Sequence, residues 1–143
     1  MSDLNDKLGK LVDKYFWNGT SGYNCAATTL LVLSEHFGIR NDLIPAVAQA
    51  FGGGYADTHR SVCGALSGGL MAIGIMKKDK PHELGQEMLA HVKDKFGSWN
   101  CDDILDIDFD DEQQVKREKD PKRISICTPL LKDLCVWLAG RLK

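Results

Sequence analysis

The sequence lacks the features that mark most secreted, membrane-spanning and nucleic-acid-binding proteins. The apolar stretch Val62 to Met76 carries no charge but has only 15 residues and several glycines, whereas about 20 apolar residues are needed to cross a bilayer. The N-terminal segment has neither the apolar centre nor the small-residue cleavage site of a secretory signal. The 18 basic and 20 acidic side chains are interspersed, so no basic face favours nucleic acid. We therefore expect a cytoplasmic protein that neither spans a membrane nor binds nucleic acid.

Several motifs of metal and phosphate binding are also incomplete. The acidic run Asp106–Asp110 begins like a calcium loop, but Asp111 occupies the position of the required glycine. His82 begins a stretch that resembles a zinc-protease motif, but Gln86 stands in place of the second histidine. The glycines at 52–54 lack the Gly-Lys-Ser/Thr ending of a phosphate-binding loop. The sequence therefore gives no support to calcium, protease-type zinc or nucleotide phosphate as a ligand.

The apolar residues recur at steps of three and four and do not alternate, which predicts helices and no strands. Glycine, proline and cap residues place the expected helices near 3–17 (ending by Asn18-Gly19), 23–37, 42–51, 61–76, 81–96 and 127–142. Between Asp106 and Arg123 the chain is highly charged and carries few apolar residues, so we expect a surface connector with one exposed helical turn. The 143 residues suit one domain. The predicted fold is all-α, a single compact bundle of about five to six helices over 1–143.

Five cysteines in a chain expected in the cytoplasm argue against structural disulfides, because that compartment keeps thiols reduced. Four of them follow residues that are typical of a helix start: Cys25, Cys63, Cys101 and Cys127. Backbone N–H groups and the helix dipole at such positions favour thiolate, which activates cysteine for attack or for metal binding. A buried cysteine without a chemical role is the alternative for each one, but four shared placements favour a common purpose. We expect Cys135 to be a core residue.

Two features near Cys63 are candidates for cofactor binding. Gly64 and Gly68 lie on one face of the expected helix, where a cofactor or another backbone could approach closely. Each glycine inside a helix lowers helix stability by about 1 kcal/mol relative to alanine. We expect close packing against another helix to offset this loss, rather than cofactor binding. His59 and Arg60 could hold a thiolate or an anionic ligand, although lone loop residues are more often solvated. We expect Cys63 to be the most reactive thiol, with a pKa below the ordinary value of about 8.5.

Taken in order along the chain, these motifs resemble those of the C_GCAxxG_C_C family of redox-active proteins. The resemblance runs from Cys25 to the C-terminal helix and is carried by Asn24-Cys25-Ala26, Phe51-Gly52-Gly53-Gly54, Cys63-Gly64-Ala65-Leu66-Ser67-Gly68, Asn100-Cys101 and Cys127. Val62 stands where the family label has a glycine, whereas the longer Cys-Gly-Ala-x-x-Gly string matches. The resemblance implies redox activity through four cysteines and, since genes of the family often neighbour transporter genes, a redox partner or transporter component. Without Cys-x-x-Cys-His, covalent haem is not implied.

Three functions stay open at this point. In the first, the chain is an oxidoreductase or electron-transfer protein in which the four cysteines surround one site. They act there either as dithiols that exchange with disulfides, without a cofactor, or as ligands of an iron–sulfur cluster or another soft metal. In the second, they bind structural zinc, although separations of 38, 38 and 26 positions lack paired Cys-x-x-Cys knuckles. In the third, the chain is a transporter-associated partner-binding module with incidental cysteines. The catalytic and the metal-binding roles are both assigned to Cys25, Cys63, Cys101 and Cys127, which we expect to cluster.

Overall fold

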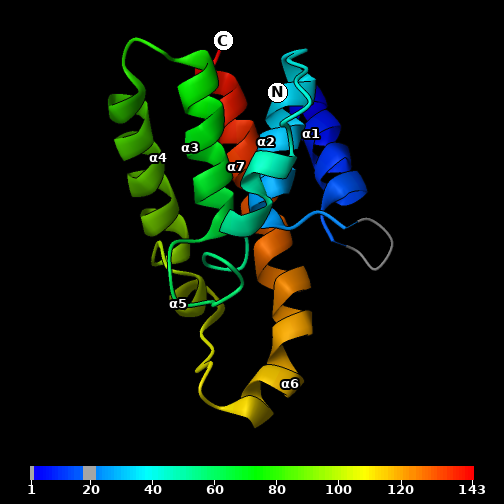
Figure 1. Cartoon of the computed structure of the whole chain (residues 1–143), viewed down its shortest axis with the longest axis vertical. Helices are drawn as coiled ribbons and strands as arrows, with labels where there is room; N and C mark the ends of the chain where they lie inside the picture. Colours follow the sequence, from blue (N-terminus) through cyan, green and yellow to red (C-terminus); the bar gives the residue numbers. More distant parts are fainter. Residues whose placement is uncertain (1, 18–21) are drawn as a thin grey trace.

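The computed structural model describes residues 2–17 and 22–143, and these residues form helices joined by loops (Figure 1). The elements are α1 (Ser2–Tyr15), α2 (Cys25–His36), the 3-10 helix η1 (Ala46–Phe51), α3 (Gly64–Met76), α4 (Pro81–Phe96), α5 (Cys101–Leu105), α6 (Glu112–Lys122), the π-helical turn η2 (Arg123–Cys127) and α7 (Thr128–Arg141). Within the described ranges there is no strand, only two isolated bridges. The all-α prediction is therefore confirmed. None of these helices combines the length and the apolar character needed to cross a membrane.

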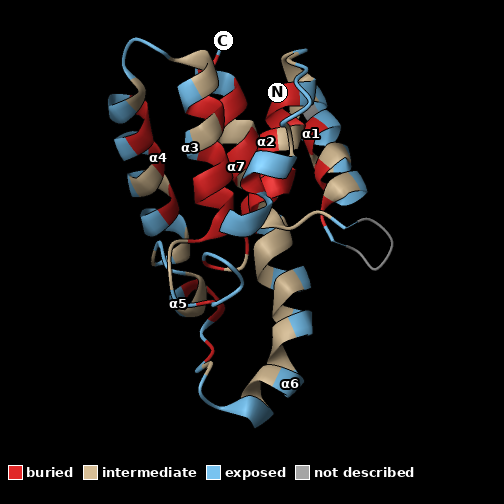
Figure 2. Ribbon diagram, in the orientation of Figure 1, coloured by how far each residue is buried: buried red, intermediate tan, exposed pale blue. Residues whose placement is uncertain are grey.

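The five longest helices form a bundle in which α2, α3 and α7 lie at the centre, with α1 and α4 at its sides (Figure 1). Buried residues concentrate on the three central helices (Figure 2). Leu30, Leu66, Leu134 and Leu138 are fully buried there. The helix α1 adds Leu8 and Val12, whose four-residue spacing places both on the face that packs against α2 and α7.

Several predicted boundaries agree with the structure, and others shift by a few residues. The helix α4 covers Pro81–Phe96 as expected, and Gly97 ends it in the left-handed conformation with φ of 89°. The helix expected over 42–51 is shorter, since only Ala46–Phe51 is helical and of the 3-10 type. Asn18 and Gly19, expected to end the first helix, lie outside the described residues.

The charged segment before the last helix is exposed or half-buried except at Ile107, which is buried, and most of it is helical. Asp111 begins α6 by accepting hydrogen bonds from the backbone N–H groups of Gln113 and Gln114, both at 3.1 Å. No residue of α6 is buried, and it extends away from the bundle (Figure 2). The prediction of a connector with one helical turn overlooked this cap, because it weighed only the lack of apolar residues. The count of α-helices therefore rises to seven in the described ranges.

The helix α6 continues through η2 directly into α7, so Cys127 lies inside a continuous helix. The backbone N–H of Thr128 donates to the carbonyl of Arg123, five residues earlier, which is the hydrogen bond of a π turn. The expectation that Cys127 opens a helix is therefore wrong. Its environment comes from the π turn, a feature often found at functional sites.

Two glycines allow α2 and α3 to approach closely. A Cβ atom added at Gly68 would lie 2.3 Å from the carbonyl oxygen of Ala26, and one added at Gly64 would lie 2.4 Å from the Cys25 Sγ atom. Neither position accepts a side chain without movement of its neighbours. Close helix packing therefore accounts for the glycines of α3 that face α2.

Substitution of Gly68 tests this packing. We expect Gly68→Ala to lower the free energy of unfolding by about 1–3 kcal/mol, because the methyl group overlaps the α2 backbone. Gly74→Ala is the matched control in the same helix, since no atom lies within 4 Å of its added Cβ. It should raise the free energy of unfolding by up to about 1 kcal/mol through helix propensity. Urea denaturation measures both, and equal effects of the two substitutions would contradict the close approach.

Candidate functional site

The four cysteines selected from the sequence line one small cavity of about 20 Å³, here called the inner cavity. The remaining lining residues are Gly64, Ala65, Ile104, Leu105, Leu130 and Leu131. All five cysteines of the chain are free thiols. The fifth, Cys135, is fully buried in the core and does not line the inner cavity. The structure thus brings together Cys25, Cys63, Cys101 and Cys127.

Two backbone hydrogen bonds hold the starts of α3 and α5 side by side. The N–H of Cys63 donates to the carbonyl of Trp99 at 2.7 Å, and the N–H of Cys101 donates to the carbonyl of Ser61 at 2.9 Å. This pair forms an antiparallel bridge between Val62 and Asn100. It places two cysteines next to each other although 38 positions separate them in the sequence.

The start of α2 is fixed against η1 in a similar way. The Asn24 side chain accepts a hydrogen bond from the Ala27 N–H at 3.0 Å and donates one to the Gln49 carbonyl at 2.6 Å. This cap orients Cys25, the first residue of α2, toward the start of α3. Gly64 leaves the space that the Cys25 sulfur requires.

A larger cavity of about 330 Å³, here called the outer cavity, is also lined by Cys25, Cys101 and Cys127. Cys63 does not line it, so this cysteine faces only the inner cavity. The rest of the outer cavity is lined by Phe16, Trp17, Gly22, Asn24, Gln49, Gly52, Gly53, Ala56, Asp57, His59, Leu105, Lys119 and Arg123. Three cluster thiols are therefore open to a space of the size that small ligands occupy.

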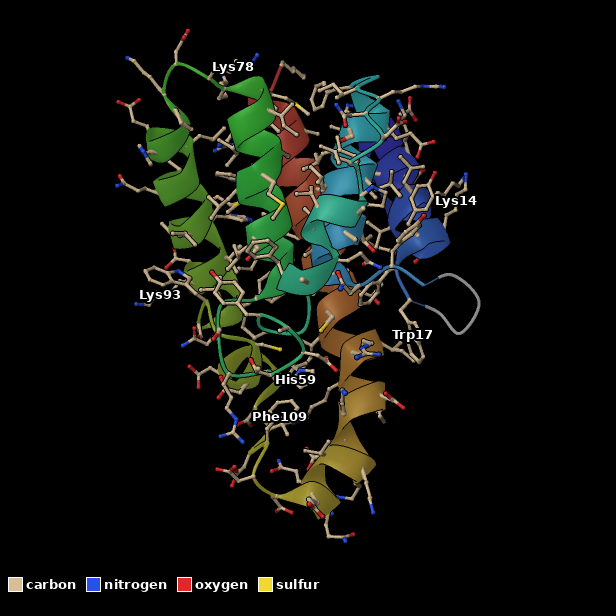
Figure 3. The ribbon with its side chains drawn as sticks, viewed as in Figure 1. Lys14, Trp17, His59, Lys78, Lys93 and Phe109 are labelled. Carbon is tan, nitrogen blue, oxygen red and sulfur yellow. The ribbon has the colours of Figure 1, made fainter. Side chains whose placement is uncertain are left out.

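His59 links the outer cavity to Cys101. Its Nδ1 atom lies 3.7 Å from the Cys101 sulfur, and its Nε2 atom lies 3.1 Å from a carboxylate oxygen of Asp57. The ring stacks on Phe109 with centroids 4.4 Å apart, and the two side chains lie together below the bundle (Figure 3). Burial, then the charge of Lys119, lowers the pKa of His59. The partners assign the proton to Nε2, where it is donated to Asp57, and leave Nδ1 to accept the thiol proton of Cys101.

The loop that carries His59 has an unusual backbone. Five consecutive residues, Gly53 to Asp57, have φ between 49° and 64°, and His59 has φ of 65°. Tyr55, Ala56, Asp57 and His59 are non-glycine residues in this left-handed region, which L-residues seldom adopt. The His59 N–H donates to the Gly53 carbonyl at 2.7 Å and closes the turn. Strain of this kind concentrates at functional sites.

Burial dominates the electrostatics of the thiols. It raises the pKa of Cys101 to about 12, with Cys25 as the second cause. It also raises the pKa of Cys63 and of Cys127, and the neighbouring cluster cysteines raise both further. The prediction that Cys63 has a lowered pKa is therefore wrong. The N–H groups of Ala65 and Leu66 at the helix start do lower it, but desolvation has the larger effect.

The donor set of the inner cavity suits a soft metal, because thiolate sulfur favours iron–sulfur clusters, copper(I) and zinc. In the part of the chain that the structure describes, however, no group of three or more histidine, cysteine or acidic side chains is arranged to hold a metal ion. The side chains would need to move before four sulfurs could coordinate one ion.

The remaining candidate residues separate into two groups. Gly64 lines the inner cavity and His59 lines the outer cavity. Gly68 faces the backbone of α2, and Arg60 forms an ion pair with Asp110 at 2.5 Å and lines neither cavity. The structure therefore brings Gly64 and His59 to the cysteines, and it places Gly68 and Arg60 elsewhere.

The sequence interpretation missed two basic residues of the outer cavity, Lys119 and Arg123. Both fall in the segment that was expected to be a connector. Together with Cys127 they are spaced four residues apart, which places all three on one face of a helix. That spacing was visible in the sequence, but the high charge and the few apolar residues of the segment argued against a helix there.

Comparison with known proteins agrees with the motif pattern. Residues 23–140 match the family described as "Putative redox-active protein (C_GCAxxG_C_C)". No curated protein and no solved structure matches the chain. The matched region covers most of the sequence and includes all four cysteines of the inner cavity. The chain therefore belongs to the C_GCAxxG_C_C family.

Proposed function

We propose that the chain is an oxidoreductase or electron-transfer protein whose inner-cavity cysteines form and break disulfide bonds. The observation that carries this proposal is the convergence of four free thiols from separate elements on one cavity. Each disulfide formed there joins two sulfur atoms and releases two electrons and two protons. The cluster could therefore hold up to two disulfides, with Cys135 outside it.

The electrostatics of the cavity support dithiol chemistry. Because burial raises their pKa, Cys63, Cys101 and Cys127 are neutral thiols at pH 7. Oxidation of two thiols to a disulfide also gives a neutral product, since the protons leave together with the electrons. Neither redox state then places an uncompensated charge in the apolar cavity, where it would be costly.

Cys101 is the thiol that we expect to react first. It faces the outer cavity and has His59 beside it, so the Nδ1 atom can take the thiol proton as the Cys101 sulfur attacks. The attacked disulfide of the reactant breaks, and its leaving sulfur takes up a proton, which yields a mixed disulfide on Cys101. Cys25 then attacks the Cys101 sulfur, loses its proton and displaces the second half of the reactant as a thiol. We choose Cys25 because it also lines both cavities.

Soft-metal binding by the same four sulfurs is the second candidate. Four sulfur donors that converge from α2, the start of α3, α5 and η2 support it. A bound ion or iron–sulfur cluster would replace the thiol protons and neutralise the thiolates. Zinc would give this site a structural role, whereas an iron–sulfur cluster would give it an electron-transfer role.

Reversible oxidation tests the dithiol proposal. Protein purified without oxygen and found free of iron, copper and zinc should lose two or four of its five thiols when equilibrated with oxidised dithiothreitol. Peptide mapping should find disulfides only among the cluster cysteines, because Cys135 is fully buried apart from them. Cys135→Ser should behave as the wild type, whereas Cys101→Ser should lose the Cys101–Cys25 bond. Stoichiometric metal with matching visible absorbance would favour the second candidate, and a disulfide to Cys135 would contradict the cluster.

The role of His59 can be tested through the rate and pH dependence of oxidation. Without a base, a thiol with a pKa of about 12 is almost wholly protonated at pH 7, so His59→Gln should slow the reaction of Cys101 with a disulfide about 100-fold. The rate should rise as His59 loses its proton, with a midpoint below the ordinary histidine pKa of about 6.5, because burial lowers that pKa.

His91 provides a matched control for this experiment. It is half-buried, lies 2.7 Å from a carboxylate oxygen of Asp133 and stacks on Trp137, but it lines neither cavity. His91→Gln should leave the oxidation rate and its pH midpoint unchanged. Equal rates for the wild type and His59→Gln, with both proteins folded by circular dichroism, would remove His59 from the mechanism.

A further inference from the structure

One wall of the outer cavity carries two basic side chains without an acidic partner. Lys119 and Arg123 lie four residues apart on the α6–η2 helix and both line the cavity. Among the residues that the structure describes, neither forms an ion pair with a carboxylate. Other basic residues of the same segment are paired, since Arg117 and Lys122 both contact Glu118. Two unpaired cations in a cavity next to reactive thiols favour an anionic ligand.

The orientation of Arg123 suits such a ligand. Its guanidinium group lies over the Trp17 ring, 4.8 Å from the ring centroid. A guanidinium group carries its N–H donors in its own plane, so the donors that point away from the ring remain available to a carboxylate. Trp17 therefore holds the group in place and contributes an apolar wall to the same cavity.

One acidic residue, Asp57, also lines the outer cavity, and its charge affects whether an anion or a cation is preferred there. Its carboxylate lies 3.1 Å from the Nε2 atom of His59, so its charge is engaged by that side chain. Lys119 has the largest charge effect on His59, and it lowers the histidine pKa as a neighbouring cation does. With a neutral His59, the cavity lining carries two positive charges and one negative charge, a balance that favours an anion.

The distance from the basic wall to the thiols limits the size of the ligand. Arg123 and Cys127 are the first and last residues of η2, so about one helical turn separates them, a rise of about 5 Å. A carboxylate two carbons away from a sulfur atom spans a comparable distance. A molecule of this kind can contact Arg123 with its acid group while its sulfur meets Cys101 or Cys127 in the same cavity.

We propose that the outer cavity binds small carboxylate-bearing disulfides through Lys119 and Arg123 and presents their sulfur atoms to the cysteine cluster. This inference rests on the proposed dithiol function and names its substrate class. The carboxylate pairs with the guanidinium and ammonium groups, and the disulfide lies against Cys101. Acidic disulfides are then preferred over neutral or basic ones of the same length.

Three small disulfides that differ mainly in charge test this preference. The reduced full-length chain is mixed at low salt with dithiodipropionate (anionic), bis(2-hydroxyethyl) disulfide (neutral) or cystamine (cationic). Each oxidation rate is divided by the rate of the same disulfide with 2-mercaptoethanol, which removes intrinsic reactivity. We expect the corrected rate for dithiodipropionate to exceed that for cystamine at least about tenfold, and the difference to shrink in 0.5 M NaCl.

Variants of the basic wall identify the residues responsible. The double variant Lys119→Gln/Arg123→Gln should abolish the charge preference, and Arg123→Lys should keep most of it because the charge remains. Lys116→Gln is the matched control, since Lys116 is exposed on the same helix and does not line the cavity. Thermal unfolding of each variant verifies the fold. A preference that survives in the double variant would overturn the assignment to Lys119 and Arg123.

Suberate separates anion binding from redox chemistry, because methylene groups replace the two sulfurs of dithiodipropionate. Its binding is measured by calorimetry on the wild type and on the double variant. If suberate binds the wild type alone and no disulfide reacts, the anion site stands and the proposed dithiol function fails. If all disulfides react at equal corrected rates and suberate does not bind, the dithiol function stands and this inference is overturned.

Discussion

The close approach of α2 and α3 is the constraint on which the site depends. Gly64 and Gly68 bring the two backbones into contact, and the same contact places the Cys25 sulfur against the start of α3. Each glycine inside a helix costs about 1 kcal/mol relative to alanine, which the buried interface with Ala26 and its neighbours offsets. A larger side chain at Gly64 would overlap the Cys25 sulfur. The packing of α2 on α3 and the position of Cys25 in the site therefore both require glycine at this position.

Desolvation and local dipoles act in opposite directions on the thiols, and desolvation has the larger effect. A helix start favours thiolate, yet the pKa values of Cys63 and Cys101 are both raised. Reactivity therefore depends on which thiol has access to a base and to open space. Cys63 faces only the inner cavity, whereas Cys101 has His59 and the outer cavity beside it. Position relative to the two cavities distinguishes residues that look equivalent in the sequence.

Much of the fold and part of the site could be predicted from the sequence, for identifiable reasons. The α4 boundaries follow from Pro81 and Gly97, which act locally, and the cysteines were found because their neighbours resemble helix caps. The helix α6 was missed because its stability comes from the Asp111 cap and side-chain pairs such as Glu118–Lys122, not from apolar spacing. The position of His59 beside Cys101 could not be predicted, because it depends on the left-handed loop before it. Most of the positive φ angles of this loop fall on residues other than glycine, and the sequence gives no sign of them.

Each cluster cysteine belongs to or directly precedes a different element of the chain, so the cluster exists only in the folded protein. The contacts that close the inner cavity join positions far apart in sequence, so the cavity forms only when the helices have assembled. In the unfolded chain the Cys101 thiol is exposed and its pKa is near the ordinary value of about 8.5, well below the value of about 12 in the native protein. Because burial raises the pKa of Cys63, Cys101 and Cys127, folding makes these three thiols less reactive toward oxidants, and the nascent chain is more easily oxidised than the native protein.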